Sequence, residues 1–95
     1  MKFEWDKKKN EQNFNKHKVT FEEAETVFDD KNAITLYDEL HSADEDRYII
    51  IGVSEGFERK LTVCHCYRGE FDEITRIISA RRANKHETKI YEEGL

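Results

Sequence analysis

The chain has 95 residues, of which 37% are hydrophobic, 39% charged and 12% aromatic, so we expect one small domain over residues 1–95 rather than a disordered chain. Its net charge of −5 argues against nonspecific binding of nucleic acid. No apolar run is long enough to cross a membrane and the first residues do not resemble a signal peptide, so we expect a cytoplasmic protein without membrane partners.

Charge is distributed unevenly along the chain. Residues 1–18 carry a net charge of +3 and residues 19–46 carry −9, whereas residues 47–71 carry +1 and residues 72–95 are neutral overall. A basic and an acidic region in one small domain suggest two surfaces with different partners. The ordinary alternative for the acidic region is a solvated helix and loop.

The first residues predict a short strand followed by a surface helix. Phe3-Glu4-Trp5 alternates apolar and polar residues, as a half-buried strand does. Asp6 can cap a helix over residues 7–18, because its carboxylate can accept hydrogen bonds from the first N–H groups. That helix is polar, so we expect Trp5 and Phe14 to hold it on the surface.

A second helix follows at once. Thr20 and Glu23 have the spacing of a capping box. The apolar residues of this helix recur at helical spacing and predict one buried stripe, made of Phe21, Ala24, Val27 and Phe28. The two helices together predict a helical hairpin over residues 6–29.

The rest of the chain predicts a sheet and a last helix. Four segments are rich in β-branched and apolar residues and are expected to be strands: residues 33–37, 48–53, 61–67 and 74–78. The turns between the later strands are short, which favours an antiparallel meander. Ser79 can cap a final helix over residues 80–91. The expected fold class is α+β, a small antiparallel sheet with an N-terminal helical hairpin and a C-terminal helix, the helices lying against one face.

Three arginines gather where the last strand meets the predicted final helix. Arg76 projects from the strand, and Arg81 and Arg82 would lie in the first helical turn, where cations oppose the helix dipole. An anionic partner would use both the arginines and the helix end. The ordinary alternatives are an ion pair at Arg76 and plain solvent exposure for the other two.

A metal or cofactor is not expected. His65 stands between Cys64 and Cys66, but strand alternation directs it to the opposite face from the two thiols. Cysteines two residues apart in a strand do not form a favoured disulfide, so both are expected to be free. Cys64 is a weak candidate nucleophile, because nothing nearby in sequence would lower its pKa.

Cleavage of RNA through the 2′-hydroxyl would suit the remaining polar residues. That reaction needs a base, an acid and positive charge at the phosphorane, and no metal. His65 and Arg76 lie on neighbouring strands, but whether they share a face depends on the register. The other candidates are Arg81, Arg82, Lys16, His17 and, as a loop acid, Glu55. The ordinary alternatives are a core histidine at His65 and helix-capping cations at Lys16 and His17.

A pattern that runs from residue 3 to residue 91 is similar to that of a known family. It consists of Phe3-x-Trp5-Asp6-x-x-Lys9-x-x-x-Asn13-x-x-Lys16-His17, Val19-x-Phe21-x-x-Ala24-x-x-Val27-Phe28-Asp29, Arg47, Gly52, Arg76-Ile77-Ile78-Ser79-Ala80-Arg81-x-Ala83, Glu87 and Tyr91. In this pattern the chain resembles the BrnT toxins of type II toxin–antitoxin systems. Lys18 departs from it, since the family commonly has Gly there.

The resemblance implies a RelE-like fold and a metal-independent endoribonuclease that cleaves RNA and so inhibits translation and growth. It also implies a BrnA-like antitoxin with a ribbon-helix-helix part, which neutralises the toxin and binds operator DNA, in an assembly with two copies of each chain. The alternative is a catalytically inactive module that only binds its partner in such a DNA-binding complex, or a small adaptor domain with ion-paired arginines.

The candidate site residues have two origins. The family pattern implies Arg76 and Arg81 as the active-site group, with Lys16 and His17 nearby. His65 joins them as a catalytic candidate through the chemistry of its side chain. The expected RNA-binding residues are Arg82, Lys9 and Glu55.

Overall fold

The computed structural model describes residues 1–94, which form a five-stranded sheet with helices on both faces. The strands are β1 (Lys2–Glu4), β2 (Ile34–Tyr37), β3 (Tyr48–Val53), β4 (Lys60–Arg68) and β5 (Ile74–Arg82). The helices are α1 (Lys7–His17), α2 (Phe21–Thr26) and α3 (Lys85–Glu93), with short 3₁₀ turns η1 (Val27–Asp29) and η2 (Glu39–His41). The predicted α+β class is confirmed. None of the helices within residues 1–94 is long and apolar enough to span a membrane.

The sheet is mixed rather than purely antiparallel. Its strand order is β1-β5-β4-β3-β2, and β2 to β5 form the predicted antiparallel meander. β1 lies parallel to β5, with Glu4 opposite Arg76. The predicted first strand therefore exists, but it is the edge strand beside β5, and its parallel pairing makes the sheet mixed.

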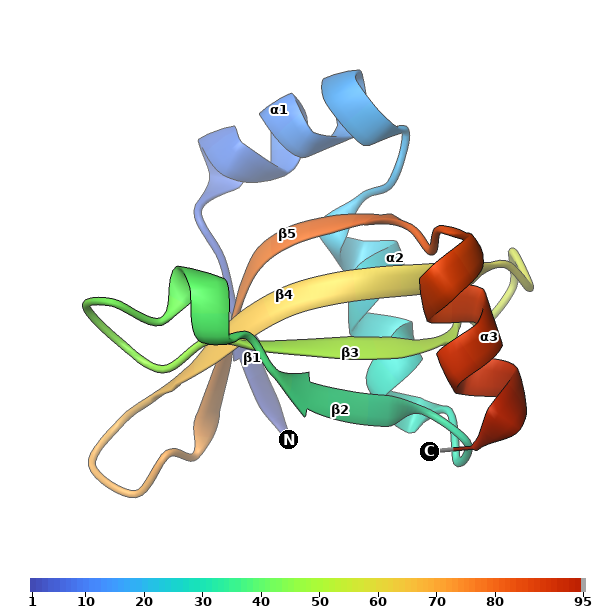
Figure 1. Ribbon diagram of the computed structural model, residues 1–95. Helices are drawn as coiled ribbons and strands as arrows, with labels where there is room; N and C mark the ends of the chain where they lie inside the picture. The colour runs from blue at the N-terminus through green and yellow to red at the C-terminus, as the bar shows by residue number, and fades with distance from the viewer. Residues whose placement is uncertain (95) are drawn as a thin grey trace.

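The helices cover both faces, whereas the sequence predicted helices on one (Figure 1). We call the face that packs against α2 and η1 the closed face. Its core consists of Val19, Phe21, Ala24 and Val27 from the helical segment against Ile50, Leu61, Val63, Ile77 and Ala80 from the strands. We call the opposite face the cleft face. α3 crosses one end of it, in front of the sheet in Figure 1, and leaves the other end uncovered.

The first two helices do not form the predicted hairpin. α1 runs beside β5 at the edge of the sheet, while α2 lies behind the sheet (Figure 1). Asn13 attaches α1 to that edge, because its Nδ2 donates to Ala80 O at 2.8 Å and its Oδ1 accepts from Ala80 N at 3.1 Å. The amide thereby satisfies the edge of β5 as a neighbouring strand would. Of the two predicted anchors, Trp5 packs against the core, with its ring centroid 6.0 Å from that of Phe21, whereas Phe14 is 45% exposed.

α1 ends at a residue with left-handed backbone. Lys18 has φ 60° and ψ 31°, and its N–H donates to Phe14 O at 2.8 Å. Glycine adopts this conformation without steric cost, whereas a lysine loses about 1 kcal/mol there. α1 therefore ends at residue 18 although this chain has Lys where the family pattern commonly has Gly.

The predicted start of the last helix is wrong. β5 continues to Arg82, because Arg81 and Arg82 pair with Thr62 and Leu61 of β4. α3 begins only at Lys85, after a capping box between Asn84 and Glu87. The arginines are therefore strand residues, and the argument from the helix dipole does not apply to them.

Candidate active site

A cleft of about 200 Å³ lies on the uncovered part of the cleft face. Strands β3, β4 and β5 form its floor, and the loop before β3 forms its rim. Most of the lining residues are polar, and two are arginines; the lining consists of Asp38, His41, Arg47, Ile49, Thr62, Cys64, Ile78, Ser79 and Arg81. We refer to this hollow as the cleft.

A β-bulge brings Arg76 and Arg81 to the same face. Residues five apart in a regular strand point to opposite faces. The register of β4 with β5 shifts between Cys64, which pairs with Ser79, and His65, which pairs with Ile77. Ile78 is therefore the extra residue, and it restores the alternation so that both arginines lie on the cleft face.

Arg81 stands at the wall of the cleft. Its two terminal nitrogens donate to the two carboxylate oxygens of Glu87 at 2.7 and 2.8 Å, and Thr62 Oγ1 donates to the same carboxylate at 2.9 Å. Burial raises the pKa of Glu87, but the hydrogen bonds from Arg81 and Asn84 outweigh it and hold that pKa below its ordinary value. The Arg81 side chain is still 42% exposed, so the guanidinium is fixed and can also bind an anion.

Arg76 lies on the same face but beside the cleft. Its Nη1 donates to Glu4 Oε2 of β1 at 2.7 Å. An ion pair at Arg76 was the alternative to an anion-binding role in the sequence analysis. At about 3.3 Å per residue, the two arginines stand roughly 15 Å apart along β5. At this separation the two guanidinium groups would contact different anionic groups of one extended ligand.

His65 lies on the closed face, away from both arginines. Cys66, not His65, is the β4 residue opposite Arg76. The imidazole is fully buried, with its ring centroid 4.9 Å from that of Phe28 and 5.3 Å from that of Tyr67. Burial lowers its pKa and keeps it neutral. The structure therefore does not form a His65–Arg76 group, and His65 has the surroundings of a core histidine.

The cysteines are free, as predicted, and both lie opposite to His65. Burial raises the pKa of Cys64, and the Asp38 carboxylate raises it further. The thiol in the cleft is therefore protonated at neutral pH and is a poor nucleophile. Within residues 1–94, no three His, Cys, Asp or Glu side chains gather as a metal site would require.

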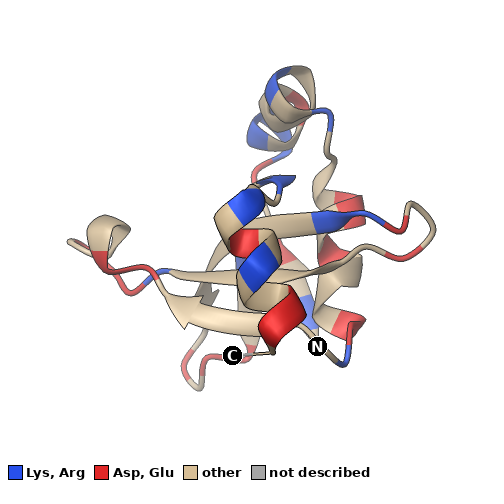
Figure 2. Cartoon of the chain, turned by 45° about the vertical axis from the view of Figure 1, so that its right-hand side comes forward, with Lys and Arg blue, Asp and Glu red and all other residues tan. Residues whose placement is uncertain are grey.

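The remaining candidates lie outside the cleft. Lys16 and His17 end α1, and Arg82 is exposed on the other side of β5 from Arg81. Lys9 is exposed in the first turn of α1. Glu55 is exposed in the turn after β3, where its N–H donates to Thr26 Oγ1 at 2.9 Å. Figure 2 shows basic residues on α1, at the top, and acidic residues on several loops, including the loop after β2 at the left.

Three charged or titratable residues of the cleft, Asp38, His41 and Arg47, were not singled out as site residues from the sequence. Arg47 appeared only in the family pattern, and Asp38 and His41 fell in a polar loop without periodicity. In the structure His41 Nδ1 lies 2.9 Å from Asp38 Oδ2. The only sequence signal was the spacing Asp-x-x-His-Ser, in which aspartate and serine are residues that commonly organise turns.

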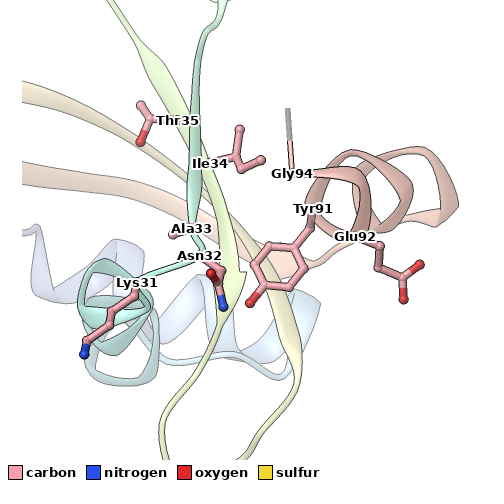
Figure 3. A pocket seen from close by; sticks show the side chains of 8 residues that line it. All are labelled: Lys31, Asn32, Ala33, Ile34, Thr35, Tyr91, Glu92 and Gly94. Carbon is pink, nitrogen blue, oxygen red and sulfur yellow. The ribbon is translucent and has the colours of Figure 1, made fainter.

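A larger hollow of about 660 Å³ lies between the start of β2 and the end of α3. Figure 3 shows the Tyr91 ring beside Asn32, with Lys31 and Glu92 pointing to opposite sides. The Tyr91 hydroxyl donates to Asp30 Oδ2 at 2.7 Å. No histidine, cysteine or arginine is among its described lining residues, so the smaller cleft has the better chemistry for a phosphate ester.

Comparison with known proteins identifies the family of the chain. The family model described as "Ribonuclease toxin, BrnT, of type II toxin-antitoxin system" matches residues 5–87. The structure is also similar to the 1.1 Å crystal structure of the Brucella abortus ribonuclease toxin BrnT, with 28% sequence identity and a TM-score of 0.67, over 90% of this chain and 99% of that one. No curated protein sequence matches the chain. The family match includes all the residues that line the cleft, and the chain belongs to the BrnT family of ribonuclease toxins of type II toxin–antitoxin systems.

Proposed function

We propose that this protein is a metal-independent endoribonuclease that cleaves mRNA, stops translation and arrests growth until a BrnA-like antitoxin neutralises it. Family membership supplies the ribonuclease class and the existence of an antitoxin. The observation that supports RNA cleavage by this chain is the cleft, in which Arg47 and Arg81 line one small hollow.

The cleft offers what cleavage through the 2′-hydroxyl requires of its charged groups. The phosphorane has more negative charge than the starting phosphodiester, so fixed cations stabilise it selectively. Arg81 is fixed by two hydrogen bonds to Glu87, and Arg47 lines the same hollow. Arg76 on the same face would bind a flanking phosphate. Lys16, His17 and Lys9 on α1 and Arg82 on β5 would extend the contact with the RNA. Glu55, exposed in the turn after β3, carries a negative charge and would not attract a phosphate.

The antitoxin is the second part of the proposal. We propose that the antitoxin is a ribbon-helix-helix protein of the BrnA type and that it forms an assembly with two copies of each chain. In this assembly only the antitoxin would contact operator DNA. We also propose that the toxin fold is related to that of RelE. The acidic residues of α2 and η1, which do not line the cleft, support separate surfaces for RNA and for protein, because RNA would avoid them. Neutralisation would require the partner to cover the cleft or to block the approach of RNA.

The test begins with the chain alone under a tightly controlled promoter in bacteria. Growth, bulk protein synthesis and RNA integrity are followed after induction, with Arg81→Ala and Arg76→Ala at matched expression. We expect rapid arrest by the wild type and much weaker arrest by either variant. Purified protein should cleave RNA in the presence of EDTA, and co-expression of the antitoxin should restore growth.

A folded wild-type protein that neither arrests growth nor cleaves RNA would contradict the proposal. It would favour the alternative of an inactive, partner-binding module in a DNA-binding complex. Cleavage that EDTA abolishes would contradict metal independence alone. Arrest by both arginine variants at the wild-type rate would remove the arginines from the active site but leave the toxin function standing.

A further inference from the structure

His41 lies where the cleft opens to solvent. Its side chain is 65% exposed, and it lines both the cleft and an adjoining hollow of about 300 Å³ that also contains Asp44, Glu45 and Arg47. Imidazole is the side chain that most often moves protons near neutral pH, and His41 is the histidine among the described residues of the cleft.

Hydrogen bonds at the base of the loop hold His41 in place. Asp38 N donates to Arg47 O at 2.9 Å, which closes the loop. Ser42 Oγ donates to Asp38 O at 2.6 Å and accepts from Arg47 N at 2.9 Å. The same hydrogen bonds fix Arg47 just before β3, so one small network positions both His41 and Arg47.

The Asp38 carboxylate selects the tautomer of the imidazole. Asp38 Oδ2 lies 2.9 Å from His41 Nδ1, and the Asp38 side chain is largely buried. A carboxylate can only accept a hydrogen bond, so Nδ1 carries the proton and donates a hydrogen bond to Asp38. The lone pair of the neutral imidazole is then on Nε2. A histidine oriented by a carboxylate in this way is the arrangement that general bases use in nucleophilic catalysis.

The geometry points to His41 as the general base of RNA cleavage, with Asp38 as its positioning residue and Arg47 and Arg81 as the phosphate-binding cations. This inference rests on the ribonuclease activity proposed above. Nε2 of His41 removes the proton of the 2′-hydroxyl, the 2′-oxygen forms a bond to phosphorus, and the bond from phosphorus to the 5′-oxygen breaks. The imidazolium then returns the proton to the 5′-oxygen. The products are a 2′,3′-cyclic phosphate and a 5′-hydroxyl, and no further reactant is needed.

The other proton carriers are less well placed. His65 is buried on the closed face, and His17 and Glu55 lie outside the cleft. Cys64 lines the cleft, but burial raises the pKa of its thiol. His41 therefore combines access to solvent, a fixed tautomer and two arginines in the same cleft.

The experiment uses purified full-length protein and an RNA oligonucleotide that the wild type cleaves, with the same oligonucleotide carrying a 2′-deoxy sugar at the cleaved position. His41→Ala should lower kcat by about 10²–10⁴-fold with little change in KM, and added imidazole should restore part of the rate. His86→Ala, which removes an exposed histidine on α3, should cleave at the wild-type rate. The deoxy substrate should bind without being cleaved, and the wild-type product should end in a 2′,3′-cyclic phosphate.

Asp38→Asn tests the positioning role. It should lower kcat less than His41→Ala does and should shift the pH profile of kcat, which a purely structural role would leave in place. The charged and titratable groups around His41 are Asp38, Asp44, Glu45, Arg47, Cys64 and Arg81. Thermal unfolding of each variant separates a loss of catalysis from a loss of fold.

Two outcomes would overturn the inference in distinguishable ways. If folded His41→Ala cleaves at the wild-type rate while Arg81→Ala does not, the ribonuclease stands and another group is the base. If the wild type cleaves neither this RNA nor bulk RNA, the proposed function itself fails and His41 loses its role with it.

Discussion

Two arginine–glutamate clusters, one on each face of the sheet, are built in the same way and differ in exposure. Glu23, third in α2 after Thr20, accepts hydrogen bonds from two nitrogens of Arg59 and from Ser54 Oγ. Glu87, third in α3 after Asn84, accepts from two nitrogens of Arg81 and from Thr62 Oγ1. The arginine side chain is 22% exposed in the first cluster and 42% exposed in the second.

The difference shows how one local motif can serve stability or function. On the closed face, Arg59 is also tied to Lys18 O at 2.9 Å, so its donors are used within the fold. On the cleft face, Arg81 is held on one side by Glu87 and remains open to the cleft on the other. The histidines repeat the contrast, because His65 is packed among aromatic rings and His41 is exposed at the cleft.

The largest expected effect is on stability, at the buried cluster. Glu23→Ala leaves the Arg59 guanidinium and the Ser54 hydroxyl without their shared acceptor, so it should lower the free energy of unfolding by about 3–5 kcal/mol. Chemical denaturation measures this loss. Glu11→Ala, at an exposed glutamate of α1, is the control and should change stability by less than about 0.5 kcal/mol. Equal losses in the two variants would remove the structural role of the closed-face cluster.

The next effect is on activity, at two adjacent arginines with opposite orientation. Arg81→Ala should lower kcat for RNA cleavage by about 10²–10³-fold, because it removes a fixed donor to the phosphorane. Arg82→Ala should leave kcat nearly unchanged and reduce the slope of RNA affinity against salt concentration by about 1, because it removes an ordinary phosphate contact. If Arg82→Ala has the larger effect on kcat, the reacting phosphate does not lie on the cleft face.

The sequence allowed much of this fold to be predicted, and the failures have physical causes. The strands and α2 were found because their apolar patterns are local. The attachment of α1 was missed because a polar residue, Asn13, makes it through contacts 67 residues apart in the chain. The start of α3 was misplaced because β4 pairs with Arg81 and Arg82 and extends β5 beyond its apolar part.

The site was predicted less completely than the fold. Arg81 lies in the cleft and Arg76 on the same face, but only because of a bulge at Ile78 that no local pattern announces. The register that separates His65 from Arg76 depends on that same bulge. The rim residues Asp38 and His41 come together through the closure of a loop, and side-chain hydrogen bonds within a polar loop leave no periodic signal.

A smaller effect on stability tests how tightly the closed face is packed. A Cβ added at Gly52 of β3 would lie 2.9 Å from Val27 Cγ1, 3.0 Å from Ala33 Cβ and 3.1 Å from Asp30 Oδ2. Gly52→Ala should therefore lower the free energy of unfolding by about 1–3 kcal/mol, because η1 must move away from the sheet. Denaturation and RNA cleavage are measured on the same protein. The remaining folded protein should keep its kcat, since the cleft lies on the other face, and a loss of kcat in folded protein would show that the faces are coupled.

The smallest expected effect is a dependence of stability on pH that arises from the buried His65. Burial lowers the pKa of His65 below its ordinary value of 6.5, so below that pH the unfolded chain binds a proton that the folded protein does not. The free energy of unfolding should fall as pH falls below about 6.5, by at most about 1.4 kcal/mol per pH unit, until folded His65 is protonated as well. The carboxylates with lowered pKa values add their losses only at lower pH; they are Asp6, Glu23, Asp30, Glu73 and Glu87.

His65→Leu should remove this dependence between pH 6.5 and 5 and leave RNA cleavage intact, because Leu fills the aromatic pocket and the imidazole does not reach the cleft. Urea denaturation at a series of pH values, beside the cleavage assay, measures both. A wild-type slope that persists in His65→Leu would assign the titration to another group. A folded His65→Leu protein that no longer cleaves RNA would mean that the closed face takes part in the chemistry, and the division of the molecule into a structural and a catalytic face would be wrong.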